Sequence, residues 1–218
     1  MELFLVDEKY KVVGFDIEHT YAHAGSRPKV TVTQMCVGHH VLVYHYCLAT
    51  RPCEHFSRFV NGPHYMFATI DITNNVKVLK NSSIACQNLV DIQGQYMIWG
   101  SKEHEKDSLV HLVAAIINPY YRDMKESCNN EKRASHSAWM ENLNKAHVVY
   151  AAKEAYTCYD IKSLEMYQLE TIARLRESVV NAEEYLKMQD KKKKVENELR
   201  FFKSDFAKMV LTKEEARS

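Results

Sequence analysis

Three strand-like runs that follow one another near the N-terminus constrain the fold of this 218-residue chain more than any other feature. They cover residues 10–17, 29–37 and 41–46 and are rich in the β-branched and aromatic side chains that favour strands. Gly38-His39-His40 separates the last two runs and is typical of a hairpin turn. Because the connections are short, the three runs predict an antiparallel meander.

Helical and strand-like patterns alternate after the meander. Pro52 opens a helical pattern that keeps its apolar residues on one side and ends at residue 60. Strands are expected at 65–72 and 85–92, and helices at 76–79, at 106–117, at 137–144 and from 145 onward. This order predicts an α/β fold with a mixed five-stranded sheet flanked by helices, in which parallel strands join the meander. The layout resembles the ribonuclease-H-like fold.

A different pattern begins at Ile161, because the chain contains no Gly or Pro beyond this residue. Apolar residues recur there at steps of three and four residues, which is typical of a helix with coiled-coil character. They are Ile161, Leu164, Ile172, Leu175, Val179, Ala182 and Leu186, followed by Val195, Leu199, Phe202, Phe206 and Met209. We therefore expect a ribonuclease-H-like domain over residues 1–170 and a helical extension over residues 171–218. The apolar stripe of the extension is suited to self-association or to a protein partner.

The charge of the chain is almost balanced, with 29 Lys and Arg against 28 Asp and Glu. A net charge of +1 excludes a protein that holds nucleic acid through bulk positive charge. The six cysteines are scattered and form no C-x-x-C pair, which predicts reduced thiols in an intracellular protein of the cytoplasm, the nucleus or both. The first residues lack the basic segment of a signal peptide, and no apolar run has the length of a membrane span. We therefore expect no membrane association.

Acidic and phenolic side chains occur at spacings that can build a metal site. Asp16 and Glu18 end the first strand-like run two residues apart, so both carboxylates project to the same face of a strand. Two hard oxygen ligands at that place suit Mg²⁺ or Mn²⁺. Tyr150 and Glu154 lie four residues apart in the expected long helix, which puts a phenol and a carboxylate on one helical face. By spacing alone, the first pair also fits a solvated strand end, and the second fits an ordinary amphipathic helix.

The motifs around these residues resemble those of a known family. Residues 13–18 (VGFDIE) resemble the first motif of the DEDD-type 3′–5′ exonuclease domain, and residues 150–156 (YAAKEAY) resemble its third motif in the tyrosine form. The resemblance covers residues 1–170 and is greatest to the Werner-syndrome-type exonuclease domain and its small plant relatives. It implies 3′–5′ digestion of single-stranded RNA or DNA with two Mg²⁺ or Mn²⁺ ions. It also implies self-association, because the small plant relatives can form ring-like homo-oligomers.

The resemblance further implies a role for each motif residue. Asp16 would bridge both metal ions, and Glu18 would hold one metal ion and the attacking water. Tyr150 would orient that water, and Glu154 stands in the place of the family's last aspartate. His19, next to Glu18, and Lys77 are the candidates for contacts with the nucleic acid.

Two positions depart from the family pattern. The second motif needs an aspartate at the start of the helix after strand 65–72, but the chain has Asn75 there or lacks the residue altogether. Asp71 is an alternative ligand, although it is expected to lie earlier, within the strand. A neutral amide binds Mg²⁺ more weakly than a carboxylate. Glu154 replaces an aspartate, and a metal ligand displaced by about 1 Å costs roughly 10²-fold in rate. Two functions therefore stay open: a weakly active exonuclease, and an inactive pseudo-exonuclease that acts as a protein-interaction or assembly module.

Other conspicuous residues have structural interpretations beside functional ones. The paired His39 and His40 fit a turn as well as a metal site, and Trp99 and Trp139 fit core packing as well as base stacking. The lysines at 191–194 fit a solvated helix surface as well as a phosphate-binding or nuclear-targeting patch. The chain has no G-x-S-x-G motif and no P-loop, so covalent catalysis has no support.

Overall fold

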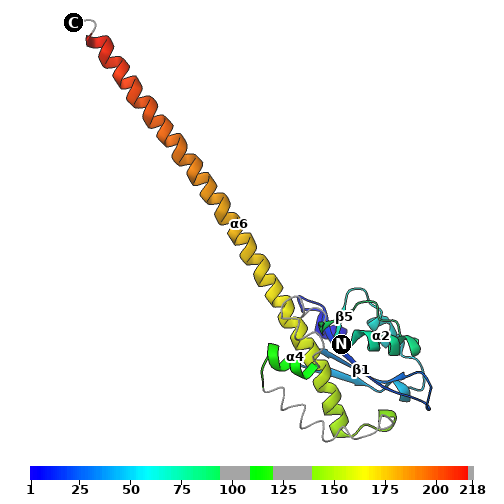
Figure 1. The fold of residues 1–218 in the computed structure, drawn as a ribbon. Helices are drawn as coiled ribbons and strands as arrows, with labels where there is room; N and C mark the ends of the chain where they lie inside the picture. Colours follow the sequence, from blue (N-terminus) through cyan, green and yellow to red (C-terminus); the bar gives the residue numbers. More distant parts are fainter. Residues whose placement is uncertain (94–108, 120–138, 216–218) are drawn as a thin grey trace. The chain divides into compact units, whose positions relative to one another are not determined.

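The computed structural model describes residues 1–93, 109–119 and 139–215. The chain divides into two compact units, Met1–Met166 and Tyr167–Ser218. Figure 1 shows a sheet with flanking helices in the first unit and a helix in the second.

Five strands form one mixed sheet in the first unit, in the order β3-β2-β1-β4-β5. The strands are β1 (Val12–Thr20), β2 (Lys29–Val37), β3 (His40–Tyr44), β4 (Met66–Thr69) and β5 (Leu89–Asp91). β1, β2 and β3 are antiparallel, whereas β1, β4 and β5 are parallel. Val37 pairs with His40, and Gly38 has the positive φ of 57° that such a tight turn requires. The predicted meander and mixed five-stranded sheet are confirmed.

Helices cover both faces of this sheet. They are η1 (Glu2–Leu5), α1 (Glu54–Val60), α2 (Ile72–Asn81), α4 (Leu109–Ile116) and the first part of α6 (Lys145–Glu215). On one face, Phe15 and Phe67 pack in one apolar cluster with residues of α1 and α2. On the other face, Val12 of β1 packs with Leu112 of α4 and Cys158 of α6. The carboxyl group of Asp16, on this second face, therefore lies between a sheet and a helix.

The close approach of α6 to β1 depends on Gly14. A Cβ atom on Gly14 would lie 2.0 Å from the carbonyl oxygen of Ala155 and 2.5 Å from the backbone nitrogen of Tyr159. Ala151 and Ala155 on the facing side of α6 are completely buried. Because no larger side chain separates the two backbones, α6 lies directly on the strand that carries Asp16.

The start of α6 coincides with the predicted one. The Asn144 Oδ1 atom accepts a hydrogen bond of 2.9 Å from the backbone N–H of His147, and this bond caps the first turn of the helix. The helix expected at 137–144 is wrong over 141–144, which are not helical, and Asn144 instead caps α6. Residues 137 and 138 lie outside the described part of the chain.

The segment between β4 and α2 also differs from the expectation. The strand expected at 65–72 ends at Thr69, and the helix expected at 76–79 extends over Ile72–Asn81. Asp71 is the N-cap of α2 with a φ of 52°, a left-handed conformation that ends the extended backbone. The expectation that Asp71 lies within the strand is therefore wrong. The apolar residues on either side of it extend a strand-like pattern beyond the true end of the strand.

The remaining boundaries move by a few residues. Tyr46, expected in the third strand, begins the short helix η2 (Tyr46–Leu48) instead. β5 is shorter than the strand expected at 85–92, and α4 confirms the described part of the helix expected at 106–117. Trp139 is buried against Tyr150 and His147, so its packing role is confirmed, whereas Trp99 lies outside the described residues.

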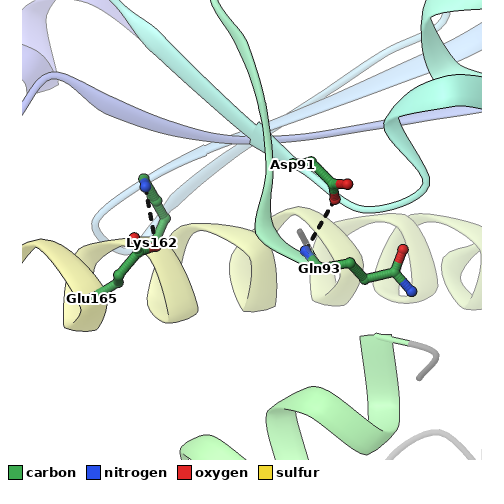
Figure 2. Close-up of polar contacts among 4 residues, drawn as sticks. All are labelled: Asp91, Gln93, Lys162 and Glu165. Atoms are coloured by element: carbon green, nitrogen blue, oxygen red, sulfur yellow. Dashed lines mark hydrogen bonds and ion pairs between the residues drawn. The ribbon is translucent and has the colours of Figure 1, made fainter. Parts of the chain in front are cut away.

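A buried lysine of α6 forms an ion pair within the helix, as Figure 2 shows. The Lys162 Nζ atom lies 3.0 Å from the Glu165 carboxylate, and the lysine side chain is almost completely buried. A charge buried in this way needs such a partner. At the end of β5, the Asp91 carboxylate accepts a hydrogen bond of 3.0 Å from the backbone N–H of Gln93 (Figure 2).

The second unit consists of the later part of α6, which continues to Glu215. Its apolar stripe is exposed to solvent, including Leu175, Val179, Leu186, Val195 and Leu199. Two local ion pairs, Arg174 with Glu170 and Lys192 with Glu196, join residues one turn apart on its surface. Among the helices in the described residues, none is long and apolar enough to cross a membrane.

Candidate active site

β1 places Asp16 and Glu18 on the sheet face that α6 covers. Asp16 pairs with Gln34 of β2, and Glu18 pairs with Val32, which packs against Tyr150 of α6. The register shifts between Glu18 and His19, where β2 has one extra residue, Thr31, opposite this step of β1. The two acidic residues share one face because they lie two residues apart in a regularly paired part of β1.

α6 brings Tyr150 and Glu154 to the same place. The Tyr150 hydroxyl donates a hydrogen bond to the Glu154 carboxylate one turn later. Tyr150 is buried against Val32 and Ala151, and its ring centre lies 6.2 Å from that of Trp139. Packing therefore fixes the phenol, and the phenol holds the carboxylate.

The electrostatics show that three carboxylates lie close together. Burial raises the pKa of Asp16 well above its usual value, and the negative charges of Glu154 and Glu18 raise it further, as does a side-chain hydrogen bond with Glu154. The pKa of Tyr150 is also raised, first by burial and then by Glu154, Glu18 and Asp16. A phenol with a raised pKa stays protonated at neutral pH, so Tyr150 acts as a hydrogen-bond donor. The carboxylates repel one another, and a cation between them would relieve that repulsion.

The donor chemistry of this cluster fits a divalent cation, because carboxylate oxygens are the ligands that Mg²⁺ and Mn²⁺ prefer. However, within the described residues no group of three or more His, Cys, Asp or Glu side chains is arranged as a ready metal site. The chain thus supplies ligand atoms of the right kind, and at present hydrogen bonds link Glu154 to Tyr150 and to Asp16.

Asn75, predicted at the place of the missing aspartate, has a structural task. It is buried in α2, and its Nδ2 donates hydrogen bonds of 2.8 Å to the Thr69 hydroxyl and 3.0 Å to the Ile70 carbonyl oxygen. These bonds tie the first turn of α2 to the end of β4. Because Ile70 offers only an acceptor, the position needs a donor, which an aspartate lacks at neutral pH.

The other predicted site residues lie on neighbouring elements. Asp71 is exposed at the start of α2, and Lys77 is exposed on the same helix. His19 is half-buried just after the register shift, with its ring centre 6.1 Å from that of Tyr21. Hydrogen bonds and electrostatic interactions directly link four of the predicted residues: Asp16, Glu18, Tyr150 and Glu154. Their catalytic roles stay predictions.

Sequence reasoning missed Gln34, which lies opposite Asp16 in the strand register. Its side chain is completely buried, and its amide nitrogen and oxygen have no hydrogen-bond partner among the described residues. An amide residue in the middle of β2, among valines and threonines, is a signal for such a position. That signal becomes specific only when the pairing of β1 with β2 is known.

The fold is similar to those of two solved nucleases. The exonuclease domain of Nibbler from Aedes aegypti shares 14% identity at a TM-score of 0.55, with 75% of this chain and 81% of that one covered. RNase D from Escherichia coli, an exoribonuclease involved in structured RNA processing, shares 17% identity at a TM-score of 0.59, with 74% of this chain covered. The chain spans only about 40% of RNase D.

Sequence comparison points to the same kind of protein at the level of the family. No curated protein matches the chain significantly. The model of the 3′-5′ exonuclease family matches residues 1–164, which include all four residues of the carboxylate and phenol cluster. This chain therefore belongs to the 3′-5′ exonuclease family.

Proposed function

We propose that the chain is a metal-dependent 3′–5′ exonuclease of low activity that acts on the 3′ end of single-stranded RNA or DNA. The observation that carries the proposal is the cluster in which Tyr150 holds Glu154 while the charges of Glu154 and Glu18 act on Asp16. Bound Mg²⁺ or Mn²⁺ would supply Lewis-acid activation of water and of the phosphate. Asp16, Glu18 and Glu154 are the residues that would hold it.

Tyr150 has a defined task in this proposal. Its pKa is raised, so the phenol does not serve as a base at neutral pH and instead donates its proton in a hydrogen bond. The hydroxyl that now binds Glu154 would orient a water molecule or a phosphate oxygen of the substrate. Burial of the ring against Trp139 and Val32 keeps the donor in place during this exchange.

The low activity follows from two residues. The amide nitrogen of Asn75 is engaged by Thr69 and Ile70, so the position offers at most a neutral oxygen to a cation. Glu154 carries one methylene more than the aspartate of the family pattern. We therefore propose that one metal ion binds well and a second binds weakly, and a two-metal reaction is slow when the second ion is rarely present.

A second candidate function is an inactive pseudo-exonuclease that serves as an assembly module. The observation that favours it is the exposed apolar stripe of α6, which is suited to a protein partner or to self-association. This candidate agrees with the proposed likeness to the Werner-type domain and its small plant relatives. Under both candidate functions we propose that the protein acts inside the cell.

Digestion of 3′-labelled single-stranded RNA and DNA with Mg²⁺ or Mn²⁺ separates the two candidates. The wild-type protein is compared with the double variant Asp16→Ala/Glu18→Ala and with Glu183→Ala/Glu184→Ala, which removes two exposed carboxylates from the second unit. We expect slow digestion by the wild type and by the second variant, and none by the first. Equal digestion by all three proteins would show a contaminant and refute the enzyme. No digestion by any of them would favour the assembly module.

A further inference from the structure

We propose that Gln34 is a positioning residue of the metal site, whose amide donates a hydrogen bond to the Asp16 carboxylate when a divalent cation is bound. The bond is direct or passes through one buried water. This inference rests on the metal-dependent function proposed above. It adds to the site a residue from β2, a strand that supplies none of the motif residues.

The strand register places Gln34 beside Asp16. The two residues are direct partners across the antiparallel pair of β1 and β2. Directly opposed residues project to the same face, with their Cβ atoms about 5 Å apart. That face lies under α6, because Val32, two residues before Gln34 on the same strand, packs against Tyr150 and Ala151. Gln34 therefore lies within the layer that holds the carboxylate cluster.

The burial of Gln34 needs an explanation. Neither its Nε2 nor its Oε1 atom has a hydrogen-bond partner among the described residues, and the side chain is completely buried. A buried amide without partners destabilises a fold, so an apolar residue of the same size would be the better choice for packing alone. The nitrogen can only donate, and the charged acceptor opposite it in the register is Asp16.

The present state of Asp16 explains why this bond awaits a cation. Asp16 now shares a side-chain hydrogen bond with Glu154, so its carboxyl group is engaged on the α6 side. A cation would take both carboxylates as ligands and replace the hydrogen bond between them. Metal-bound carboxylates are in turn held by hydrogen bonds from a surrounding layer of residues. Gln34 is a neutral donor on the β2 side of Asp16, and it adds no charge to the site.

Titration with Mn²⁺ alone, followed by electron paramagnetic resonance of the free ion, tests the inference without any need for nuclease activity. Gln34→Met removes the amide and keeps the length of the side chain. Thr33→Val is the matched control, because Thr33 is its neighbour on β2, is also completely buried and also has an unpartnered hydroxyl, but projects to the other face of the sheet. Both variants remove an unsatisfied polar group, so both are expected to keep or raise the melting temperature.

We expect Gln34→Met to weaken Mn²⁺ binding by roughly 10-fold to 100-fold, the range found when such supporting residues are removed, and Thr33→Val to leave it unchanged. Equal Mn²⁺ affinity in the wild type and in folded Gln34→Met would overturn the role of Gln34 while leaving the metal site intact. Equal weakening by both variants would also overturn it, because the effect would then be a general one of β2. A wild type that binds Mn²⁺ no better than Asp16→Ala/Glu18→Ala would refute the proposed function together with this inference.

Discussion

Phe67 in the first unit and Leu175 in the second are both large apolar residues, yet the first is completely buried and the second is 61% exposed. Phe67 lies in a strand whose two faces are covered by helices, so its burial is complete within one chain. Leu175 lies on a helix that the described residues of the second unit leave uncovered. The first unit therefore buries its large apolar side chains within its own core. The apolar stripe of the second unit would be buried only by contact with residues outside that unit.

Truncation of one residue from each unit gives the largest expected contrast. Phe67→Ala should lower the free energy of unfolding by about 3–5 kcal/mol, because it leaves a cavity in a closed core. Leu175→Ala should change it by less than about 0.5 kcal/mol, because the side chain is already in water. Urea denaturation followed by circular dichroism measures both. Similar losses of unfolding free energy for the two variants would contradict the contrast between the units and show that the stripe is buried in solution.

Gly14 tests how strictly the first unit is packed. Gly14→Ala should destabilise it by about 3 kcal/mol, because the new methyl group would overlap the Ala155 carbonyl oxygen and force α6 away from β1. Ser178→Ala on the exposed surface of α6 is the control and should be neutral within about 0.5 kcal/mol. An unchanged unfolding midpoint for Gly14→Ala would mean that α6 does not lie directly on β1.

Asn75→Asp introduces an acid where the sequence predicts the family's missing aspartate, but the structure indicates a loss of stability. The change removes two hydrogen-bond donations, to Thr69 and Ile70, and we expect a loss of about 2 kcal/mol at neutral pH. Asn74→Asp, one residue earlier on the same helix, serves as the control. Thermal unfolding measures the loss, and Mn²⁺ titration shows whether the new carboxylate binds metal. Full stability of Asn75→Asp would show that the amide does not tie α2 to β4.

The helix cap before α6 has a smaller expected effect. Asn144→Ala should destabilise the protein by about 1 kcal/mol, because the His147 N–H loses its acceptor, whereas Asn144→Ser should retain most of the stability. Chemical denaturation of both variants measures the difference. Equal losses for alanine and serine would indicate that the Asn144 side chain contributes by packing and not as a cap.

The smallest effect on stability, but a clear one on assembly, is expected for the stripe. Leu186 and Met188 are both 62% exposed. Only Leu186 belongs to the stripe, because side chains two positions apart on an α-helix point in directions about 200° apart around its axis. Leu186→Asp should reduce any self-association measured by sedimentation velocity, and Met188→Asp should leave it unchanged, while both should unfold within about 0.5 kcal/mol of the wild type. Identical sedimentation of the wild type and Leu186→Asp would show that the stripe serves another partner or none.

The sequence alone was sufficient for the elements with strong local signals. The hairpin at Gly38, the meander and the beginning of α6 near Lys145 follow from turn residues and periodicity. Local signals failed where a single backbone angle decides the outcome. Asp71 ends β4 through a left-handed φ of 52°, and nothing in the pattern around it distinguishes that conformation from a continued strand.

The resemblance of two motifs to the exonuclease family selected the candidate site residues, and the spacing of Asp16 with Glu18 and of Tyr150 with Glu154 predicts that each pair shares a face. Only the tertiary structure decided how these pairs interact. The packing of α6 on Gly14 brings the two pairs together, and the bonds of Asn75 to Thr69 and Ile70 explain why an amide suits the place of the missing acid. The pairing of β1 with β2 adds Gln34, a residue 18 positions away from Asp16 along the chain. The physical reason is that periodicity determines the direction of a side chain on its own element, whereas its neighbours depend on contacts between elements.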